Sequence, residues 1–268
     1  MNDIKSRVYA FHGCDRKVGT TMVAASSAKI LAKALHPGRV LFVALNGTDD
    51  LAFSKDSEAT IETIKTRIDN GLMTGEEIMD VCGRNEELYT LGGVSGITAH
   101  RNYSVEFSQN LISRALENFD VIVADCGNEI DCSLCIGCLE AGGSNIMVIN
   151  QNETSLVRYE CSKVVYSSLG IDFDSCIINR YIDSDPHDID YLRTRLGVDE
   201  FNAYHTVREE KNVGRLAEMD GRLIIDYRCP AYANDVKKMV YELVKEKSYP
   251  EFIPRDKKSG KGRQHRIM

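Results

Sequence analysis

The sequence predicts an α/β protein with a mostly parallel sheet flanked by helices on both faces. Apolar runs of strand length alternate with helical patterns from end to end. In addition, a strand, a polar loop and an alanine-rich helical pattern follow one another directly between Val8 and Ala25. No linker rich in Pro, Gly or Ser interrupts this alternation, so residues 1–250 are predicted to form a single domain.

The expected elements are placed by apolar runs and by helical periodicity. Strands are expected near Val8–Phe11, Val40–Leu45, Leu88–Leu91, Val121–Ala124, Ile146–Asn150 and Cys176–Asn179, with a weaker one at Ala203–Val207. Helices are expected near Thr20–Leu35, Thr60–Asp69, Val105–Leu116, Asp131–Glu140, Thr154–Leu169, Asp188–Leu196 and Ala233–Lys245.

Composition narrows the class of protein. The hydrophobic fraction of 43% and the charged fraction of 27% are typical of a soluble globular chain. A net charge of −7 argues against nucleic-acid binding over the whole surface but leaves local basic patches possible, and no sequence-specific nucleic-acid partner is expected. No targeting or membrane-spanning segment is visible, which predicts a cytoplasmic protein. Nine cysteines in such a protein indicate reduced thiols or a metal site.

The C-terminal segment 251–268 differs from the rest of the chain. From Arg255 to Met268 it carries six Lys/Arg residues against one Asp, with almost nothing apolar. This composition predicts a basic, disordered tail. The tail is interpreted either as a solvated terminus or as a weak contact with an anionic membrane surface or nucleic acid.

The loop of the first strand–loop–helix unit has the shape of a phosphate-binding loop. In such a loop, backbone N–H groups and a helix N-terminus face an anion. The standard motif places a Gly, four residues and then Gly-Lys-Ser/Thr. Here Gly19 is followed by Thr20 and Thr21, so the lysine is missing, and Cys14 stands at the first glycine position.

A second motif is the apolar strand that ends in Asp125. A strand-terminal acid is where a nucleotide hydrolase keeps the carboxylate that meets Mg²⁺ through water. Such an acid often only caps a turn, but this one lies downstream of the phosphate loop. It is expected at the carboxyl edge of the same sheet, where ligands bind in folds of this class.

Three further segments make the order of motifs specific. NGTDD follows the strand at Val40–Leu45, CGNEID follows Asp125, and INQNETSLVRYE is followed by SCIINRY. With the loop, this succession resembles the MinD/ParA group of deviant Walker A P-loop ATPases over roughly residues 5–247. The loop VGTTMVA is most similar to the TadZ/CpaE branch, which is associated with the positioning and assembly of pili at a cell pole.

The resemblance assigns roles to the loop. Thr21 stands where the family has its Mg²⁺-binding hydroxyl, and Thr20 takes the place of the phosphate-binding lysine. Asp15 takes the place of the signature lysine that crosses the dimer interface. The other cofactor-binding positions of the loop are Arg16 and Lys17, which replace two glycines, and the matching Val18 and Gly19.

The resemblance also assigns the remaining nucleotide contacts. Asp125 matches the family acid, so Mg²⁺ is expected between Thr21 and Asp125. Asn179 matches the asparagine that reads adenine, and Arg180 lies beside it. The backbone near Val207–Glu209 is expected to complete the adenine pocket.

The departures from the family pattern bear on hydrolysis. Thr20 cannot neutralise β- and γ-phosphate charge as a lysine does. Asn46 stands at an acidic switch position and cannot accept a proton from water. We therefore predict an ATP-binding protein with little or no hydrolysis. The alternative is a slow ATPase in which Lys17 supplies the charge and Asp49 or Asp50 supplies the carboxylate, with Asp125 as a further catalytic candidate.

The family resemblance implies partners and a location. It predicts a homodimer that acts as a positioning or assembly scaffold. It also implies contact with components of pilus or secretion machinery, and a polar or membrane-peripheral location within the cytoplasm.

A rival interpretation comes from the cysteines. Cys132, Cys135 and Cys138 have the spacing that starts a ferredoxin motif, and Cys126 lies just upstream. Related nitrogenase-type iron proteins hold an iron–sulfur cluster near this switch, so a cluster carrier is one alternative. The other is a helix capped by Asp131 whose thiols face the core, since Cys is among the most buried residue types.

Overall fold

The computed structural model describes residues 7–35, 38–48, 59–85, 88–96 and 98–245. Within them, one eight-stranded sheet has the order β3-β4-β2-β5-β1-β6-β7-β8. All neighbouring strands are parallel except β3, which pairs antiparallel with β4. The strands are β1 (Val8–Gly13), β2 (Val40–Ala44), β3 (Gly83–Asn85), β4 (Leu88–Leu91), β5 (Val121–Asp125), β6 (Ser144–Ile149), β7 (Ser175–Tyr181) and β8 (Ala203–Arg208).

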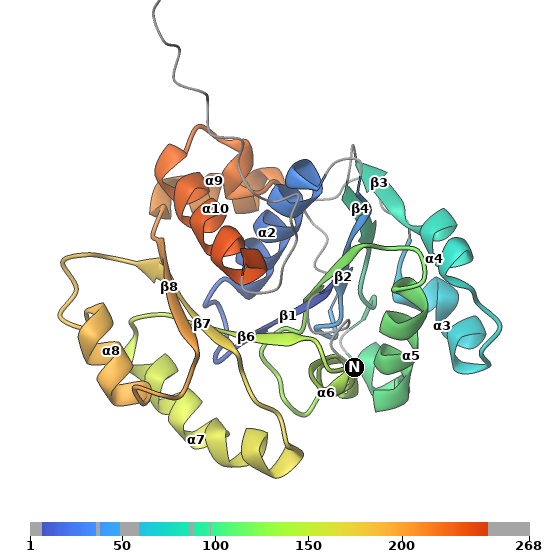
Figure 1. The fold of residues 1–268 in the computed structure, drawn as a ribbon, viewed down its shortest axis with the longest axis horizontal. Helices are drawn as coiled ribbons and strands as arrows, with labels where there is room; N and C mark the ends of the chain where they lie inside the picture. The colour runs from blue at the N-terminus through green and yellow to red at the C-terminus, as the bar shows by residue number, and fades with distance from the viewer. Residues whose placement is uncertain (1–6, 36–37, 49–58, 86–87, 97, 246–268) are drawn as a thin grey trace, which may run out of the picture.

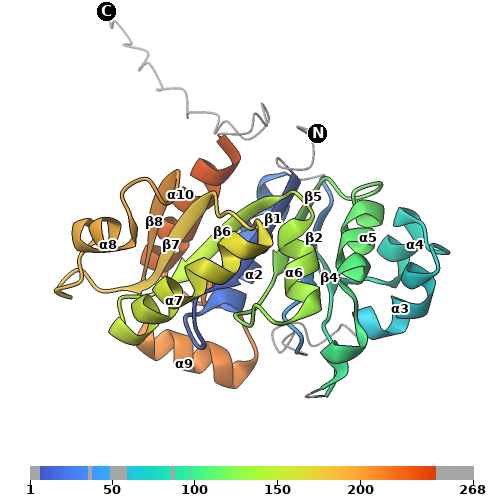
Figure 2. The ribbon, with the colours of Figure 1, turned by 90° about the horizontal axis from the view of Figure 1, so that it is seen from below.

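Helices cover both faces of the sheet, as predicted (Figure 1). The helices α2, α9 and α10 lie on one face, and α5, α6 and α7 lie on the other (Figure 2). The helices are α2 (Thr20–Ala34), α3 (Ile61–Asp69), α4 (Gly75–Val81), α5 (Val105–Ala115), α6 (Ser133–Glu140), α7 (Glu153–Leu169), α8 (Ile189–Leu196), α9 (Lys211–Asp220) and α10 (Pro230–Lys245).

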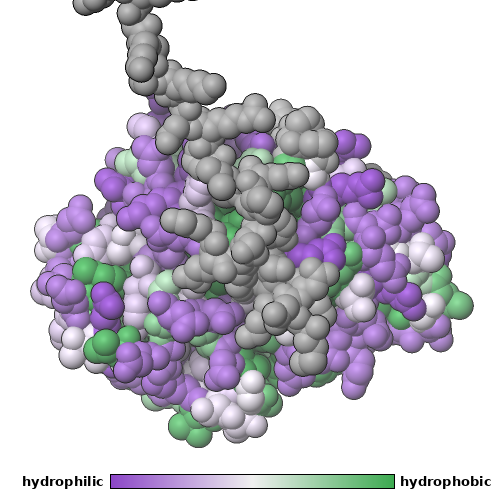
Figure 3. Space-filling view, viewed as in Figure 1, coloured by the Kyte–Doolittle hydropathy of each residue, from purple (hydrophilic) through white to green (hydrophobic). Residues whose placement is uncertain are grey.

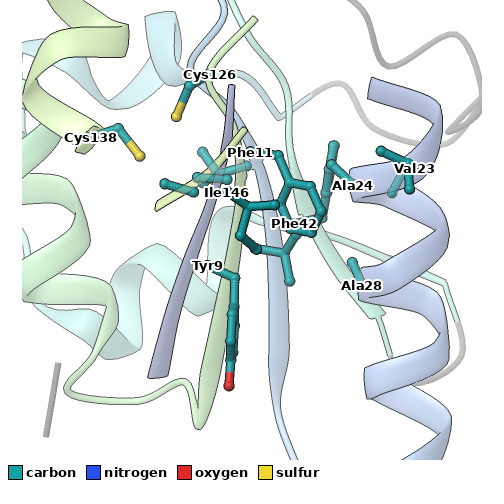
Figure 4. Close-up of a cluster of buried hydrophobic side chains, with 14 of the residues drawn as sticks. Tyr9, Phe11, Val23, Ala24, Ala28, Phe42, Cys126, Cys138 and Ile146 are labelled. Atoms are coloured by element: carbon teal, nitrogen blue, oxygen red, sulfur yellow. The ribbon is translucent and has the colours of Figure 1, made fainter. Parts of the chain in front are cut away.

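Strand β1 is central because β5 and β6 flank it. Its residues, like those of β2, β5 and β6, are all buried, as expected for strands covered on both faces. Phe11 and Phe42 pack against Ala24 and Ala28 of α2 in this core (Figure 4). The small alanines let the helix lie close to the sheet, which fixes the start of α2 at the carboxyl edge of β1.

Each predicted strand and helix is present, with ends that differ by a few residues. Two helices and one strand were not predicted: α4, α9 and β3. The predicted cap Asp131 is wrong, because α6 begins at Ser133 and Cys132 is its N-cap residue, without a side-chain cap. Strand β1 extends through Gly13, so the phosphate loop starts later than predicted.

Two sequence predictions concern residues outside the described ranges. These are the switch acids Asp49 and Asp50, and the tail 251–268. No helix in the described part of the chain is long and apolar enough to cross a membrane.

Candidate nucleotide site

The loop between β1 and α2 is anchored at both ends. The backbone N–H of Gly13 donates to the Gly127 carbonyl at 2.7 Å, and that of Cys14 donates to the Val148 carbonyl at 2.9 Å. At the other end, Gly19 has φ 89° and precedes α2 with no side-chain cap. The N–H groups of the first turn of α2 therefore lack a side-chain acceptor, which suits them to an anion.

The loop residues that replace glycine are held by other segments. Asp15 accepts a hydrogen bond from Ser155 Oγ at 3.3 Å, and its carboxylate lies 3.6 Å from Arg158 Nε. Arg16 Nε donates to Glu129 Oε1 at 3.0 Å. Both side chains are thus engaged by α7 and by the segment after β5.

Lys17 adopts a left-handed backbone with φ 60°, a conformation that is uncommon for a residue other than glycine. Its side chain is exposed and lines the cleft described below. Within the described ranges it makes no hydrogen bond or ion pair. Arg180, with φ 55°, is the other non-glycine residue with positive φ in this part of the chain, and it lines the same cleft. Strained residues of this kind concentrate at functional sites.

The predicted Mg²⁺ ligands are brought together. Thr21 Oγ1 donates to Asp125 Oδ2 at 2.6 Å, and Asn46 Nδ2 donates to the same oxygen at 3.1 Å. The other carboxylate oxygen accepts from the Gly127 backbone N–H at 3.1 Å. Asp125 is fully buried, so these donors stabilise its charge at the end of β5.

Position 20 carries no charge and its hydroxyl is turned back toward β1. A Cβ added to Gly13 would lie 2.3 Å from Thr20 Oγ1, so the hydroxyl packs directly against this glycine. Thr20 is 7% exposed. A glycine at position 13 is therefore required by close approach of the first turn of α2.

Asn179 supports the loop from the opposite side. Its Nδ2 donates to the Val18 carbonyl at 2.8 Å, and the side chain is buried. A Cβ at Gly19 would lie only 2.4 Å from this Nδ2. The Asn179 side-chain amide, which was predicted to bind adenine, thus stabilises the phosphate loop through a hydrogen bond in this structure. Neighbouring Arg180 lies 4.0 Å from a carboxylate oxygen of Glu209.

Val207 does not reach the cleft. It is fully buried in β8, whereas its neighbour Arg208 is exposed, because successive side chains of a strand point to opposite faces. The backbone prediction at this position stays a prediction. Val18 is buried too and contributes its carbonyl to Asn179.

Most residues of the phosphate loop line one cleft with a volume of about 980 Å³. It runs from the loop and Asn46, past Asn179 and Arg180, to α9. Sequence reasoning missed the α9 side, where the lining residues are Lys211, Gly214, Arg215, Ala217, Glu218 and Gly221. Helix α9 was not predicted because KNVGRLAEMDG mixes charged residues with glycine and shows no apolar face. In the structure, Ala217 is the buried residue of this helix.

The cysteine cluster lies in the core. Cys126, Cys132, Cys135 and Cys138 are buried, and Figure 4 shows the first and last of these pointing toward one another beside Phe11. Burial raises the pKa of the Cys126 and Cys135 thiols well above the ordinary value. Among the described residues, no group of three or more His, Cys, Asp or Glu side chains is placed to hold a metal ion. The geometry favours buried thiols over a cluster.

His12 belongs to the same buried region. Its Nε2 lies 3.1 Å from the Tyr166 hydroxyl, and its Nδ1 lies 3.4 Å from Cys135 Sγ. Its ring also stacks on Phe173. Burial lowers the pKa of His12 to about 4, so the imidazole is neutral at pH 7.

The mostly parallel eight-stranded sheet and the cleft at its carboxyl edge define a MinD/ParA-type P-loop NTPase fold. Among solved structures, a ParA family ATPase from Chlorobium tepidum TLS aligns with a TM-score of 0.76 at 17% identity, over 90% of this chain and 98% of that one. The septum site-determining protein MinD of Pyrococcus horikoshii, solved with Mg-ADP, aligns with a TM-score of 0.69 at 18% identity, over 91% and 99%.

A complex of a Cyanothece McdA variant with ATP gives a TM-score of 0.64 at 14% identity, over 89% of this chain and 96% of that one. At these identities the likeness shows the fold. No family model matches the sequence. No curated protein matches it significantly either.

Proposed function

We propose that this protein binds ATP with Mg²⁺ and serves as a positioning or assembly scaffold with little or no hydrolysis. The observation that carries the proposal is the convergence of Thr21 and Asp125 at the start of α2. The Thr21 hydroxyl and the Asp125 carboxylate supply oxygen ligands of the kind that Mg²⁺ takes beside phosphate. When bound, the ion would neutralise phosphate charge.

Among the described residues, positions 20 and 46 supply neither a cation nor a base, which supports binding without hydrolysis. Thr20 is uncharged and packed against Gly13. The amide of Asn46 cannot take a proton, and Asp125 is already held by three donors. Transition-state stabilisation needs a charge placed where negative charge develops, and these residues do not provide one.

A slow ATPase is the second candidate, and Lys17 favours it. This side chain lines the cleft, is exposed and has no partner within the described ranges. A lysine needs only approximate placement to act as a point charge. The hypothesis requires that Lys17 turn toward the phosphates.

The scaffold role extends the resemblance to the TadZ/CpaE branch. We propose a homodimer whose nucleotide state sets its contacts with pilus or secretion components. The neighbours of this fold include a MinC:MinD complex from Aquifex aeolicus, which shows a related fold engaged by another protein. Size measurement with and without ATP tests the dimer.

Equilibrium titration with ATP and Mg²⁺ tests the proposed binding. We expect saturable, Mg²⁺-dependent binding that weakens at least tenfold in Thr21→Ala. Thr194→Ala is the matched control, because it removes another helical hydroxyl, bonded to the Asp190 carbonyl, away from the cleft. No saturation at millimolar ATP would reject the proposal.

Phosphate release separates the two candidates. The scaffold proposal expects release at the level of a protein-free blank. Turnover that is lost in Lys17→Ala would support the slow ATPase instead. Turnover that Lys17→Ala leaves unchanged would reject the role of this lysine.

A further inference from the structure

The cleft extends well beyond the phosphate loop, onto one face of α9. Lys211, Gly214, Arg215 and Glu218 all line it, and their spacing places them on one side of the helix. The total volume of about 980 Å³ is near the upper end of the range of roughly 300–1,000 Å³ for small-molecule sites. The same cleft thus includes the space next to α9. Figure 3 shows the face of the molecule seen in Figure 1, which is mainly hydrophilic with scattered hydrophobic residues.

The two cations of α9 that line the cleft differ in their contacts from Arg180 and Arg208, which also line it. Elsewhere in the cleft, Arg208 is bonded bidentately by Asp235, with distances of 2.6 and 3.1 Å. Arg180 lies 4.0 Å from Glu218. By contrast, Lys211 and Arg215 form no hydrogen bond or ion pair with any described residue. One helical turn apart, they present two free positive charges to the same space.

Gly214 lies between these two cations. A glycine inside a helix costs about 1 kcal/mol relative to alanine. Packing does not require it here, because an added Cβ would meet only Ile224 Cδ1, at the ordinary contact distance of 3.7 Å. The missing side chain leaves the helix backbone open to the cleft, as expected where a ligand approaches closely.

We propose that the α9 end of the cleft binds a second phosphate group, so that the ligand is a nucleotide phosphorylated on its ribose as well as at the 5′ position. This inference rests on the proposed function. The 5′ phosphates face the start of α2, and the ribose phosphate is held by Lys211 and Arg215 over Gly214. Charge-assisted hydrogen bonds to phosphate give the added group its affinity.

Competition binding with matched nucleotides tests the inference. The probes are ADP, ADP with a 2′-phosphate and ADP with a 3′-phosphate, each with Mg²⁺. We expect one of the phosphorylated forms to bind at least tenfold more tightly than ADP. Comparison of the 2′- and 3′-phosphorylated forms identifies which ribose position the site recognises. In Lys211→Ala/Arg215→Ala that preference should disappear, so that the three nucleotides bind with equal affinity.

The control variant is Lys237→Ala/Lys238→Ala, which removes the same charge from exposed positions of α10 outside the cleft. It should keep the full preference. Equal affinity for the three nucleotides, or an equal loss in both double variants, would overturn the inference and leave ATP binding standing. If none of the three binds, the proposed function fails together with the inference. Circular dichroism verifies that each variant is folded.

Discussion

Acid should destabilise the fold through His12, the buried residue at the end of β1. Burial lowers the pKa of His12 from 6.5 to about 4. As pH falls, the unfolded chain therefore takes up this proton before the folded chain does. The stabilisation is complete above about pH 6.5 and is lost between about pH 6.5 and pH 4. Since one pH unit corresponds to about 1.4 kcal/mol, the full window is worth about 3 kcal/mol.

Urea unfolding at a series of pH values measures this effect. Between pH 7.5 and pH 4.5 we expect the free energy of unfolding to fall by about 2.5 kcal/mol more in the native protein than in His12→Phe. The phenylalanine keeps the stacking on Phe173 but cannot be protonated. Exposed carboxylates such as Glu77, whose pKa is lowered mainly by a backbone hydrogen bond at Thr74, titrate in both proteins. Their contribution to the free energy of unfolding therefore cancels when the two proteins are compared. Parallel curves for the two proteins would refute the reasoning.

The remaining predictions concern the loop. Thr20→Lys restores a cation at an uncharged position, so ATP affinity should rise at least tenfold and phosphate release should become measurable; unchanged binding would contradict this role of charge. Asn179→Ala removes the 2.8 Å hydrogen bond to the buried Val18 carbonyl and should cost about 1–3 kcal/mol in urea unfolding. Gly19→Ala should lower the free energy of unfolding more than Gly71→Ala does. Both glycines have positive φ, but only a Cβ at position 19 would meet Asn179, at 2.4 Å. Equal losses in urea unfolding would show that this steric clash contributes nothing.

Much of the fold could be predicted because buried parallel strands read as continuous apolar runs. VIVAD in β5 and VLFVA in β2 are examples, and each is buried throughout. Helix α4 lacked a long apolar pattern, but its capping box, in which Thr74 and Glu77 bond each other's backbone N–H, was a readable start signal. Helix α9 buries only Ala217, so periodicity carried almost no information there.

The candidate site was predictable only where strand ends determine position. Thr21 and Asp125 meet because β1 and β5 are parallel neighbours whose carboxyl ends share one edge. The directions in which individual side chains point could not be predicted from the sequence. Asn179 turns toward Val18, and Asp15 turns toward Ser155 on α7, through contacts between segments far apart in the chain.

The distribution of charge along the cleft bears on the choice between binding and catalysis. At the loop, Arg16 is paired with Glu129 and position 20 is neutral, which leaves Lys17 as the unpaired cation there within the described ranges. Two further cations that line the cleft, Lys211 and Arg215, lie on α9 and form no hydrogen bond or ion pair with a described residue. A charge remote from the reacting phosphate interacts equally with substrate and transition state, so it raises affinity without raising rate. Phosphoryl transfer requires the opposite arrangement, with charge concentrated at the β- and γ-phosphates. This placement favours a protein that responds to the presence of its nucleotide over one that turns the nucleotide over.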